Sequence, residues 1–254
     1  MNTELKYHRD AVNLLPEVPR FSVSSAELLR KREEQLGIKF PDSVREWYSL
    51  DGAVNLLELY SNNDSPVEID KLGDLFEDWY GGGPKDFLSE RILLFMHENQ
   101  GVCNWAISLD GSSDPPVIVE VDTAPNAKWL PCADKFSTFI WCQIWDHSQH
   151  SVGVSAQEIE LTKVDLDFLK SNFRQHRTTN SWPGNANYRF ESTDARILIW
   201  EGEDQADWFL SASTASDLKR LLAKVWHCGR LADSLYGDGE SQKVLKQMDS
   251  GTRK

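Results

Sequence analysis

The chain has 254 residues, of which 40% are hydrophobic and 11% are aromatic. This composition can fill a substantial core and excludes a disordered chain. The 40 acidic residues outnumber the 27 basic residues, and the net charge of -13 disfavours nonspecific binding to nucleic acid or to an anionic membrane surface. This charge is more consistent with a protein that binds a basic partner, or with a soluble protein that binds no charged partner.

The four cysteines indicate a reducing compartment. They form no C-x-x-C pair, and each sits beside apolar or aromatic residues, as buried thiols do: Cys103, Cys132, Cys142 and Cys228. The N-terminus lacks the apolar stretch of a signal peptide, and no apolar run is long enough to span a bilayer. We therefore expect a cytoplasmic protein.

Residues 1–20 are predicted to be a lead-in segment, in which the apolar run at 11–15 favours a short helix. The first clear helix is predicted from Ser24, because Ser24-Ser25-Ala26-Glu27 has the form of a capping box. This helix runs to Leu36, and Gly37 can adopt the left-handed conformation that ends it.

A second helix is predicted from Pro41, which loses nothing in a first helical turn, to the Asp51-Gly52 stop. The run Ala53–Tyr60 is interpreted as a strand. From Asp70 to Tyr80 the pattern predicts a third helix with one apolar and one acidic face. Its apolar residues are Leu72, Leu75, Phe76 and Trp79, and its acidic residues are Asp70, Asp74, Glu77 and Asp78.

Three apolar runs predict an antiparallel meander, which is the centre of the first domain. They are Ile92–Met96, Val102–Leu109 and Val117–Val121, separated by turn-forming residues at 98–101 and 110–116. Because the central run is apolar on both faces, we expect helices to cover one side of the sheet.

A loop at Thr123–Pro131 and a helix capped by Asp134 are predicted to complete the first domain, which spans residues 21–146. A polar linker is predicted at 147–157. A smaller α+β unit, docked on the first domain, follows at 158–236, and a mobile tail follows at 237–254. This unit contains a helix at Val164–Phe173, three short strands, and a last helix capped from Thr214-Ala215-Ser216-Asp217.

The segment Leu28–Gly52 has a helix ending in Leu-Gly, a Phe-Pro step, and an aromatic-rich helix ending in a Gly turn. Together with Glu98–Val102, Trp105 and Asp114–Val117, it resembles the SMI1/KNR4 family, also called the SUKH superfamily, over roughly Phe21–Asp146. The resemblance implies an α+β fold in which two N-terminal helices pack on a twisted antiparallel sheet that a later helix closes.

The same resemblance implies a non-enzymatic immunity protein. Many bacterial relatives neutralise a cognate toxin, often a nuclease, by covering its active site, and an acidic protein suits a basic nuclease surface. Two alternatives stay open: a regulatory scaffold like that implied by fungal relatives, and an enzyme of unrecognised chemistry. The oligomeric state and the identity of the partner are open too.

The sequence offers no catalytic motif for a hydrolase, a phosphate loop or a dinucleotide site. His97-Glu98 beside Cys103 could form a catalytic pair, but a strand end followed by a turn carboxylate is favoured, because no third orienting group is visible. Cys132 and Cys142 lack zinc-ligand spacing toward the histidines. We therefore expect no catalytic residues, no metal and no cofactor.

The acidic face of the predicted third helix is the candidate partner-binding site. Clustered carboxylates can steer the Lys and Arg residues of a partner toward the surface. An ordinary solvated helix face is the competing interpretation. The candidate residues are Asp70, Asp74, Glu77, Asp78, Trp79 and Tyr80.

Overall fold

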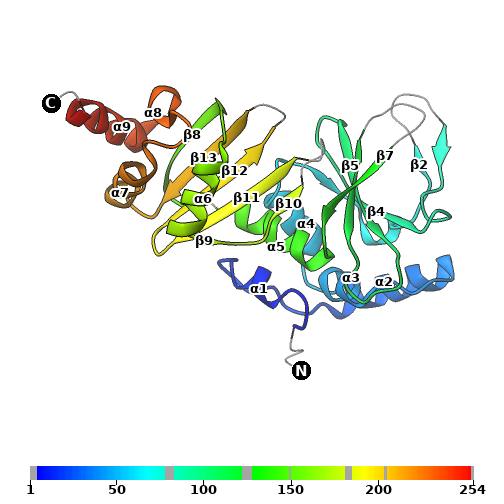
Figure 1. Cartoon of the computed structure of the whole chain (residues 1–254). Coiled ribbons are helices and arrows are strands. Elements are labelled where there is room, and N and C mark those ends of the chain that lie inside the picture. The colour runs from blue at the N-terminus through cyan, green and yellow to red at the C-terminus, as the bar shows by residue number, and fades with distance from the viewer. Residues whose placement is uncertain are drawn as a thin grey trace. The chain divides into compact units, whose positions relative to one another are not determined.

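The protein divides into two compact units, 1–148 and 149–254, each with its own antiparallel sheet and helices (Figure 1). The computed structural model describes residues 5–77, 83–121, 128–148, 150–180, 185–202 and 205–252. The fold class is α+β, as the sequence predicted. The predicted docking of the second unit on the first stays a prediction.

The first unit is built on a five-stranded antiparallel sheet of order β1-β4-β5-β6-β7. Its strands are β1 Ser65–Pro66, β4 Ile92–His97, β5 Cys103–Ser108, β6 Val117–Val121 and β7 Lys128–Ala133. A separate two-stranded pair is formed by β2 Phe76–Glu77 and β3 Pro84–Lys85. The described helices are α1 Arg9–Val12, α2 Val23–Leu36, α3 Asp42–Tyr48, α4 Ala53–Leu59, the 3-10 turn η1 Ile69–Lys71, and α5 Phe136–His147.

The predicted meander is confirmed as β4, β5 and β6, with Leu93 opposite Ile107 and Ile107 opposite Val117. One face of this sheet packs on the helices. The Phe95 ring of β4 lies 5.3 Å from Phe136 and 5.2 Å from Phe139 of α5, in edge-to-face contacts that favour close aromatic packing. The main core of the first unit therefore lies between the sheet and its helices.

The segment predicted as a lead-in belongs to the first unit. Within residues 1–20, α1 buries Ala11 and Val12 and contacts α5. His8, next to it, is fully buried against the Trp47 and Phe136 rings. The segment is part of the core because α1 packs against α5, which lies more than 100 residues later in the sequence.

Helix α2 begins at Val23, one residue before the predicted start at Ser24, because its N-cap is Ser22. The Ser22 backbone is extended and its hydroxyl accepts the Ser25 N–H at 3.2 Å. Ser22 N–H also donates to the Ser49 carbonyl at 2.8 Å, which keeps this residue outside the helix. The end of α2 is as predicted, since Gly37 has a φ of 66°.

The strand predicted at Ala53–Tyr60 is wrong, because the segment forms α4. Ala53 and Leu57 are buried one turn apart, whereas Leu59 is exposed. Only a helical period places Ala53 and Leu57 on the same face and Leu59 away from it. So short an apolar run fits a strand and a helix equally well in sequence.

The acidic helix predicted at Asp70–Tyr80 is also wrong over its described part. The chain forms η1, then turns at Gly73 with a φ of 77°, and continues into β2. A Cβ at Gly73 would lie 3.0 Å from the Leu36 side chain, so the backbone packs closely on the end of α2. This contact replaces the helical turn that the apolar spacing predicted, and Asp78, Trp79 and Tyr80 lie outside the described residues.

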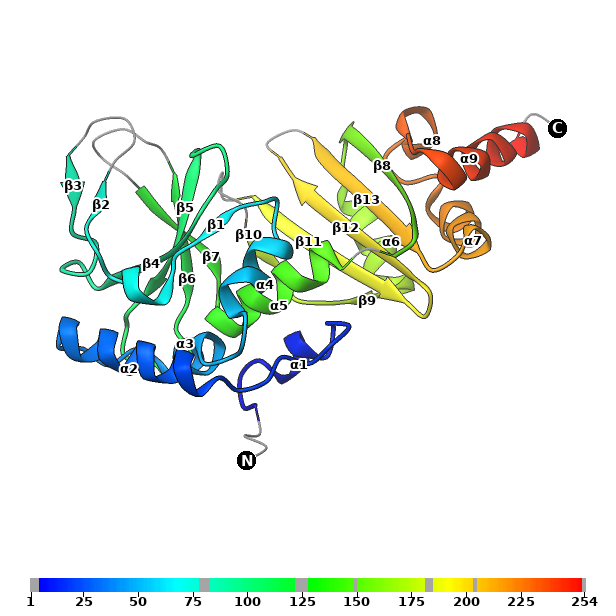
Figure 2. The ribbon, with the colours of Figure 1, turned by 180° about the vertical axis from the view of Figure 1, so that it is seen from behind.

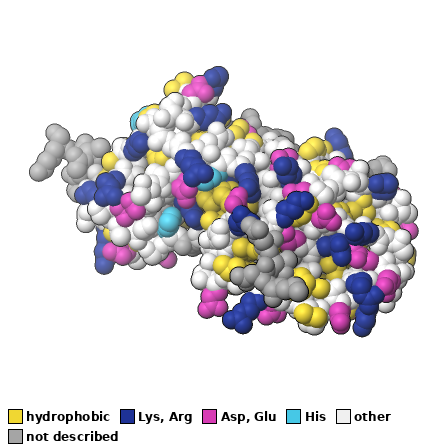
Figure 3. Space-filling model, turned by 90° about the horizontal axis from the view of Figure 1, so that it is seen from below, with side chains coloured by type: hydrophobic (Ala, Val, Ile, Leu, Met, Phe, Trp, Pro, Cys, Tyr) yellow, Lys and Arg dark blue, Asp and Glu magenta, His cyan; other side chains and the backbone are white. Residues whose placement is uncertain are grey.

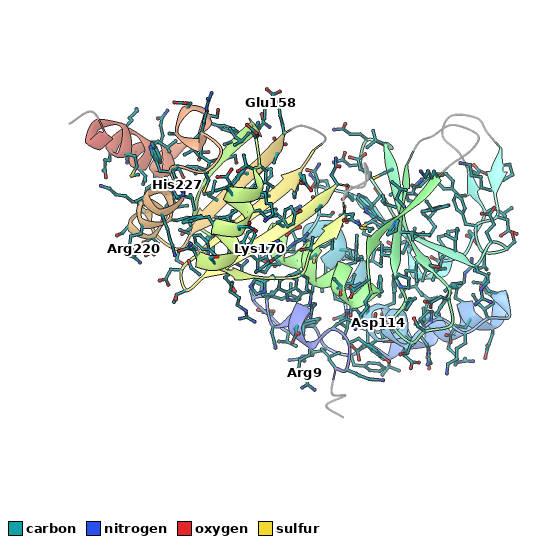
Figure 4. All side chains as sticks on the ribbon, viewed as in Figure 1. Arg9, Asp114, Glu158, Lys170, Arg220 and His227 are labelled. Carbon is teal, nitrogen blue, oxygen red and sulfur yellow. The ribbon has the colours of Figure 1, made fainter. Side chains whose placement is uncertain are left out.

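Two further predictions around α5 are corrected. The loop predicted at Thr123–Pro131 contains the start of β7 from Lys128, and residues 123–127 lie outside the described part of the chain. Asp134 does not cap α5. Asp114, labelled in Figure 4, does so from the Asp-Pro-Pro turn: its carboxylate accepts the Ser137 N–H at 3.0 Å and the Ser137 hydroxyl at 2.6 Å.

The second unit has a sheet of order β10-β11-β12-β13-β8, with β9 beside β11. The predicted helices and three strands are present, and Thr214 caps α7 by accepting the Asp217 N–H at 3.2 Å. Its elements are β8 Val152–Ile159, α6 Lys163–Asn172, β9 Arg174–Gln175, β10 Thr179–Asn180, β11 Ala186–Ser192, β12 Ala195–Glu201, β13 Ala206–Ala212, α7 Ala215–Val225, α8 Leu231–Ser234 and α9 Gly239–Thr252.

The predicted linker and the predicted mobile tail are both wrong. Within 147–157, Val152 and Val154 are buried, because β8 pairs along β13 and packs on the core of the second unit. Within 237–254, α9 buries Val244, and the Ser241 hydroxyl accepts the Gly153 N–H at 3.2 Å. Their polar composition concealed a strand and a helix that tertiary contacts stabilise.

Candidate functional site

The face of the first sheet that points away from α5 carries the candidate site. Figures 1 and 2 both show the sheet between α5 and the β2–β3 pair. A small apolar cluster on this face includes Phe87, Leu94 and Ala106. The Phe87 ring lies 5.7 Å from Phe76 and 5.3 Å from Trp129, so aromatic contacts join β2 to β7 across the sheet.

A polar row crosses the same face. His97, Asn104 and Glu120 are direct neighbours on β4, β5 and β6, and the period of two residues in a strand puts their side chains on one face. His97 Nδ1 and Asn104 Oδ1 are 2.7 Å apart, and Asn104 Nδ2 donates to Glu120 Oε2 at 2.6 Å. We call these three residues the cross-strand polar row.

Glu120 is the charged end of this row. Its exposed fraction is 4%, and a buried carboxylate is costly unless it is hydrogen-bonded and paired with a cation. Lys85 of β3 supplies the cation, with its Nζ 3.4 Å from Glu120 Oε1. The ion pair therefore ties the β2–β3 pair to the sheet.

The row also sets the orientation of the histidine. Because the carboxylate of Glu120 only accepts, the Asn104 amide nitrogen faces it and the amide oxygen faces His97. Nδ1 of His97 must then donate, which leaves Nε2 as the acceptor of the neutral ring. The ring is held flat against Phe76, with centroids 5.4 Å apart and planes at 21°.

Beside His97 lies a groove of about 280 Å³, which we call the acidic groove. Its exposed charged side chains are the carboxylates of Asp74 and Glu77 and the amine of Lys71, and Leu75 between the two carboxylates is 58% exposed. Its lining residues are Val67, Lys71, Gly73, Asp74, Leu75, Phe76, Glu77, Leu94 and His97. An apolar centre with a charged rim is the arrangement that protein-binding sites use.

The structure separates the candidate residues that the sequence grouped. Asp74 and Glu77 line the acidic groove together, whereas Asp70 is exposed on η1 and does not line it. Asp74 is paired with the NH2 group of Arg32, whose Nε donates to the Leu72 carbonyl at 2.7 Å. The Asp74 carboxylate is therefore fixed in an ion pair and is not one of the row of unpaired carboxylates that the predicted helix face implied. Asp78, Trp79 and Tyr80 lie outside the described residues.

Sequence reasoning missed the cross-strand polar row. The alternation of polar and apolar residues in β5 and β6 was a signal that Asn104 and Glu120 share the outer face. Which residue of β4 stands opposite Asn104 depends on strand register, and a bulge between Leu94 and Met96 shifts it. The row could therefore be identified only once the strands were paired.

The catalytic pair of His97-Glu98 with Cys103, which the sequence disfavoured, does not form. His97 is bound to Asn104, while Glu98 Oε2 accepts the N–H groups of Gln100 at 2.6 Å and Val102 at 3.2 Å. Burial raises the pKa of the Cys103 thiol, which disfavours the thiolate that a nucleophile needs. Glu98 therefore holds the turn between β4 and β5, as the favoured interpretation predicted.

Within the described ranges, no group of three or more His, Cys, Asp or Glu residues could hold a metal ion. The four cysteines are buried, as their apolar neighbours indicated. In the same part of the chain, no helix has both the length and the apolar character that a bilayer crossing requires.

Residues 24–141 match the SMI1 / KNR4 family (SUKH-1). The matched range runs from the first turn of α2 to the middle of α5 and includes the whole five-stranded sheet. This part of the chain belongs to the SMI1/KNR4 family. No curated protein and no solved structure gives a significant match. The match does not extend to the second unit.

The two turn motifs that resemble the SMI1/KNR4 family, at 98–102 and 114–117, stabilise the fold of this domain through hydrogen bonds. Besides the turn held by Glu98, the Asn99 N–H donates to Asp64 Oδ1 at 3.2 Å, and the Asn99 side chain donates to the Asn62 carbonyl. The turn between β4 and β5 is thus tied to the loop before β1. Asp114 likewise ties the turn before β6 to α5. These contacts hold the sheet that carries the acidic groove.

Proposed function

We propose that this chain is a non-enzymatic protein-binding module, an immunity protein that neutralises a cognate bacterial toxin, such as a basic nuclease, through an acidic surface. The observation that carries the proposal is the acidic groove on a SMI1/KNR4 domain. Asp74 and Glu77 flank the exposed Leu75, so one short segment offers an apolar contact between two carboxylates. The net charge of -13 favours encounter with a basic partner.

The residues beneath the groove support it by keeping its shape. The Arg32 side chain holds Asp74, and the Lys85–Glu120 pair holds the β2–β3 pair on the sheet. A surface that is rigid before binding loses little conformational entropy when a partner covers it. The proposed contact therefore consists of Glu77, Leu75 and the outward side of Asp74, with Asp70 adding to the local negative charge.

Co-expression with the product of a neighbouring toxin-like gene tests the function. We expect the chain to restore growth and to form a complex with the toxin. A toxin that stays active and does not bind the chain would contradict the proposal.

Charge reversal tests the site. Asp70→Lys with Glu77→Lys should slow association in low salt, and the difference should shrink as salt screens the charges, since the Debye length is about 10 Å at 0.1 M. Glu58→Lys with Glu90→Lys makes the same change at exposed positions outside the acidic groove and serves as the control. Equal association rates for both double variants would reject the acidic groove as the contact.

A further inference from the structure

A second groove lies on the first unit and shares no lining residue with the acidic groove. Its volume is about 1040 Å³, and we call it the N-terminal groove. It is formed by the N-terminal segment, the first half of α2, and α3. Its lining residues are Leu5, Lys6, Tyr7, Val18, Pro19, Arg20, Phe21, Val23, Ala26, Leu29, Arg30, Asp42, Arg45, Glu46, Ser49 and Leu50.

Large hydrophobic side chains are exposed along this groove. Val18, Phe21 and Val23 have exposed fractions of 58%, 49% and 68%. Scattered exposed hydrophobic residues need no explanation, but three that line one groove mark a surface that gains free energy when covered. Figure 3 looks onto this side, where hydrophobic side chains lie among those of both basic and acidic residues.

The backbone at Phe21 is paired along one edge with the backbone at Leu50. Ser22 N–H donates to the Ser49 carbonyl at 2.8 Å, and Asp51 N–H donates to the Arg20 carbonyl at 2.7 Å. In such a pair, the N–H and carbonyl groups of the residue between, Phe21, point to the opposite edge. Within the described part of the chain no hydrogen bond reaches these two groups, so this edge can accept another strand.

The charges around the groove favour an anionic partner, although the whole chain is acidic. Four cationic residues line it, against the two acidic residues Asp42 and Glu46. The Glu46 carboxylate is already used, because it accepts the backbone N–H groups of Lys6, Tyr7 and His8 at 2.7, 2.8 and 2.8 Å. The lining cations are Lys6, Arg20, Arg30 and Arg45. Arg30 pairs with Glu34, and Arg45 pairs with Glu33 at 3.2 Å, so Lys6 and Arg20 are the cations that an anionic partner would meet.

We propose that the N-terminal groove binds an extended segment of a partner protein in which hydrophobic residues alternate with Asp or Glu. The segment pairs with the open backbone edge at Phe21. Its hydrophobic side chains cover Val18, Phe21 and Val23, and its carboxylates meet Arg20 and Lys6. This surface differs in charge and in position from the acidic groove and does not depend on it.

The probe is a short synthetic peptide in which Val and Phe alternate with Glu, compared with the same peptide carrying Lys in place of each Glu. Fluorescence anisotropy with the full chain should show binding of the Glu peptide and much weaker binding of the Lys peptide. Phe21→Ser and Arg20→Glu should each weaken binding of the Glu peptide by about tenfold or more, because both remove a central contact. Leu59→Ser, at a 70% exposed position of α4 outside the groove, is the control and should bind normally.

Amide hydrogen exchange on the complex tests the strand pairing, and we expect the Phe21 N–H to become protected. Equal binding of both peptides, no binding of either, or normal binding by Phe21→Ser would overturn the proposal. Concentration-dependent dimerisation that Phe21→Ser abolishes would overturn it too, since the occupant would then be a second copy of the chain. The Asp70→Lys with Glu77→Lys variant should keep its affinity for the Glu peptide, which separates this proposal from the toxin-binding one.

Discussion

His8 shows how one buried titratable residue links the N-terminal segment to the core. Its Nε2 donates to the Ser43 carbonyl at 2.9 Å, and its ring packs 5.3 Å from Trp47 and 5.6 Å from Phe136. Burial is the main reason that its pKa lies below the ordinary 6.5, because a charged ring is disfavoured without water. The folded protein therefore holds this histidine neutral.

The sign of the resulting pH dependence follows from the direction of that shift. Because the folded pKa of His8 is depressed, the unfolded chain binds the proton more readily, and stability falls as the pH drops below about 6.5. The slope for one such proton reaches at most about 1.4 kcal/mol per pH unit. His8→Phe keeps the ring packing and should remove this part of the dependence, which denaturant unfolding at pH 5 and pH 7 measures. Equal pH dependence in both proteins would contradict the assignment.

Asp64 gives a prediction of the opposite sign. Burial is the main cause that raises its pKa above the ordinary 3.8, although the Asn99 N–H donates to it. A raised folded pKa means that the folded protein binds the proton more tightly, so stability from this group is lost as the pH rises above 3.8. We therefore expect the difference in unfolding free energy between Asp64→Asn and the natural chain to shift in favour of Asp64→Asn when the pH rises from 4 to 7. A stability difference that stays constant between these two pH values would contradict this.

At the scale of elements, α5 depends on a cap from another part of the chain. The Asp114 carboxylate accepts two hydrogen bonds from Ser137, and the Pro115 carbonyl accepts the Phe136 N–H at 2.7 Å. Asp114→Ala should lower the unfolding free energy by about 1 kcal/mol, within the range for a lost N-cap. Asp134→Ala is the matched control, since Asp134 does not cap the helix, and its effect should be small. Equal losses in both variants would contradict the assigned cap.

The pair of β2 and β3 depends on the ion pair of Lys85 with Glu120. Lys85→Met should leave the Glu120 carboxylate buried without this cation, and breaking a buried pair from one side costs roughly 3 kcal/mol or more. Lys85→Met with Glu120→Gln should recover part of that loss, because no buried charge remains. Urea unfolding of the three proteins measures the recovery. A double variant no more stable than Lys85→Met would show that the charge is not the cause.

At the scale of the whole molecule, the two units have separate cores. Trp47, Phe95 and Phe136 are buried in the first, and Phe190 and Trp208 are buried in the second. A unit that buries its own apolar core can fold alone. We therefore expect residues 1–148, expressed by themselves, to unfold cooperatively and to retain the proposed binding at both grooves. A fragment without a cooperative transition would show that the second unit completes the first.

Local chemistry was enough to predict much of the architecture from the sequence. The left-handed Gly37 at the end of α2, the Thr214 cap of α7, and the turns of the meander depend on residues only a few positions apart. The resemblance to the SMI1/KNR4 family could also be seen in the sequence, because the motifs of that family are helix ends and turns of this kind. The family match over residues 24–141 confirms it.

Only the tertiary structure decided the candidate site. The segment from Asp70 has the apolar spacing of a helix, yet Gly73 packs on Leu36 and the chain turns there instead, so Asp74 and Glu77 line a groove. The cross-strand polar row depends on strand register, and the cap of α5 comes from Asp114, 23 positions before Ser137. Spacing along the chain records which residues are neighbours within one element, whereas contacts between elements are selected by packing of the whole unit.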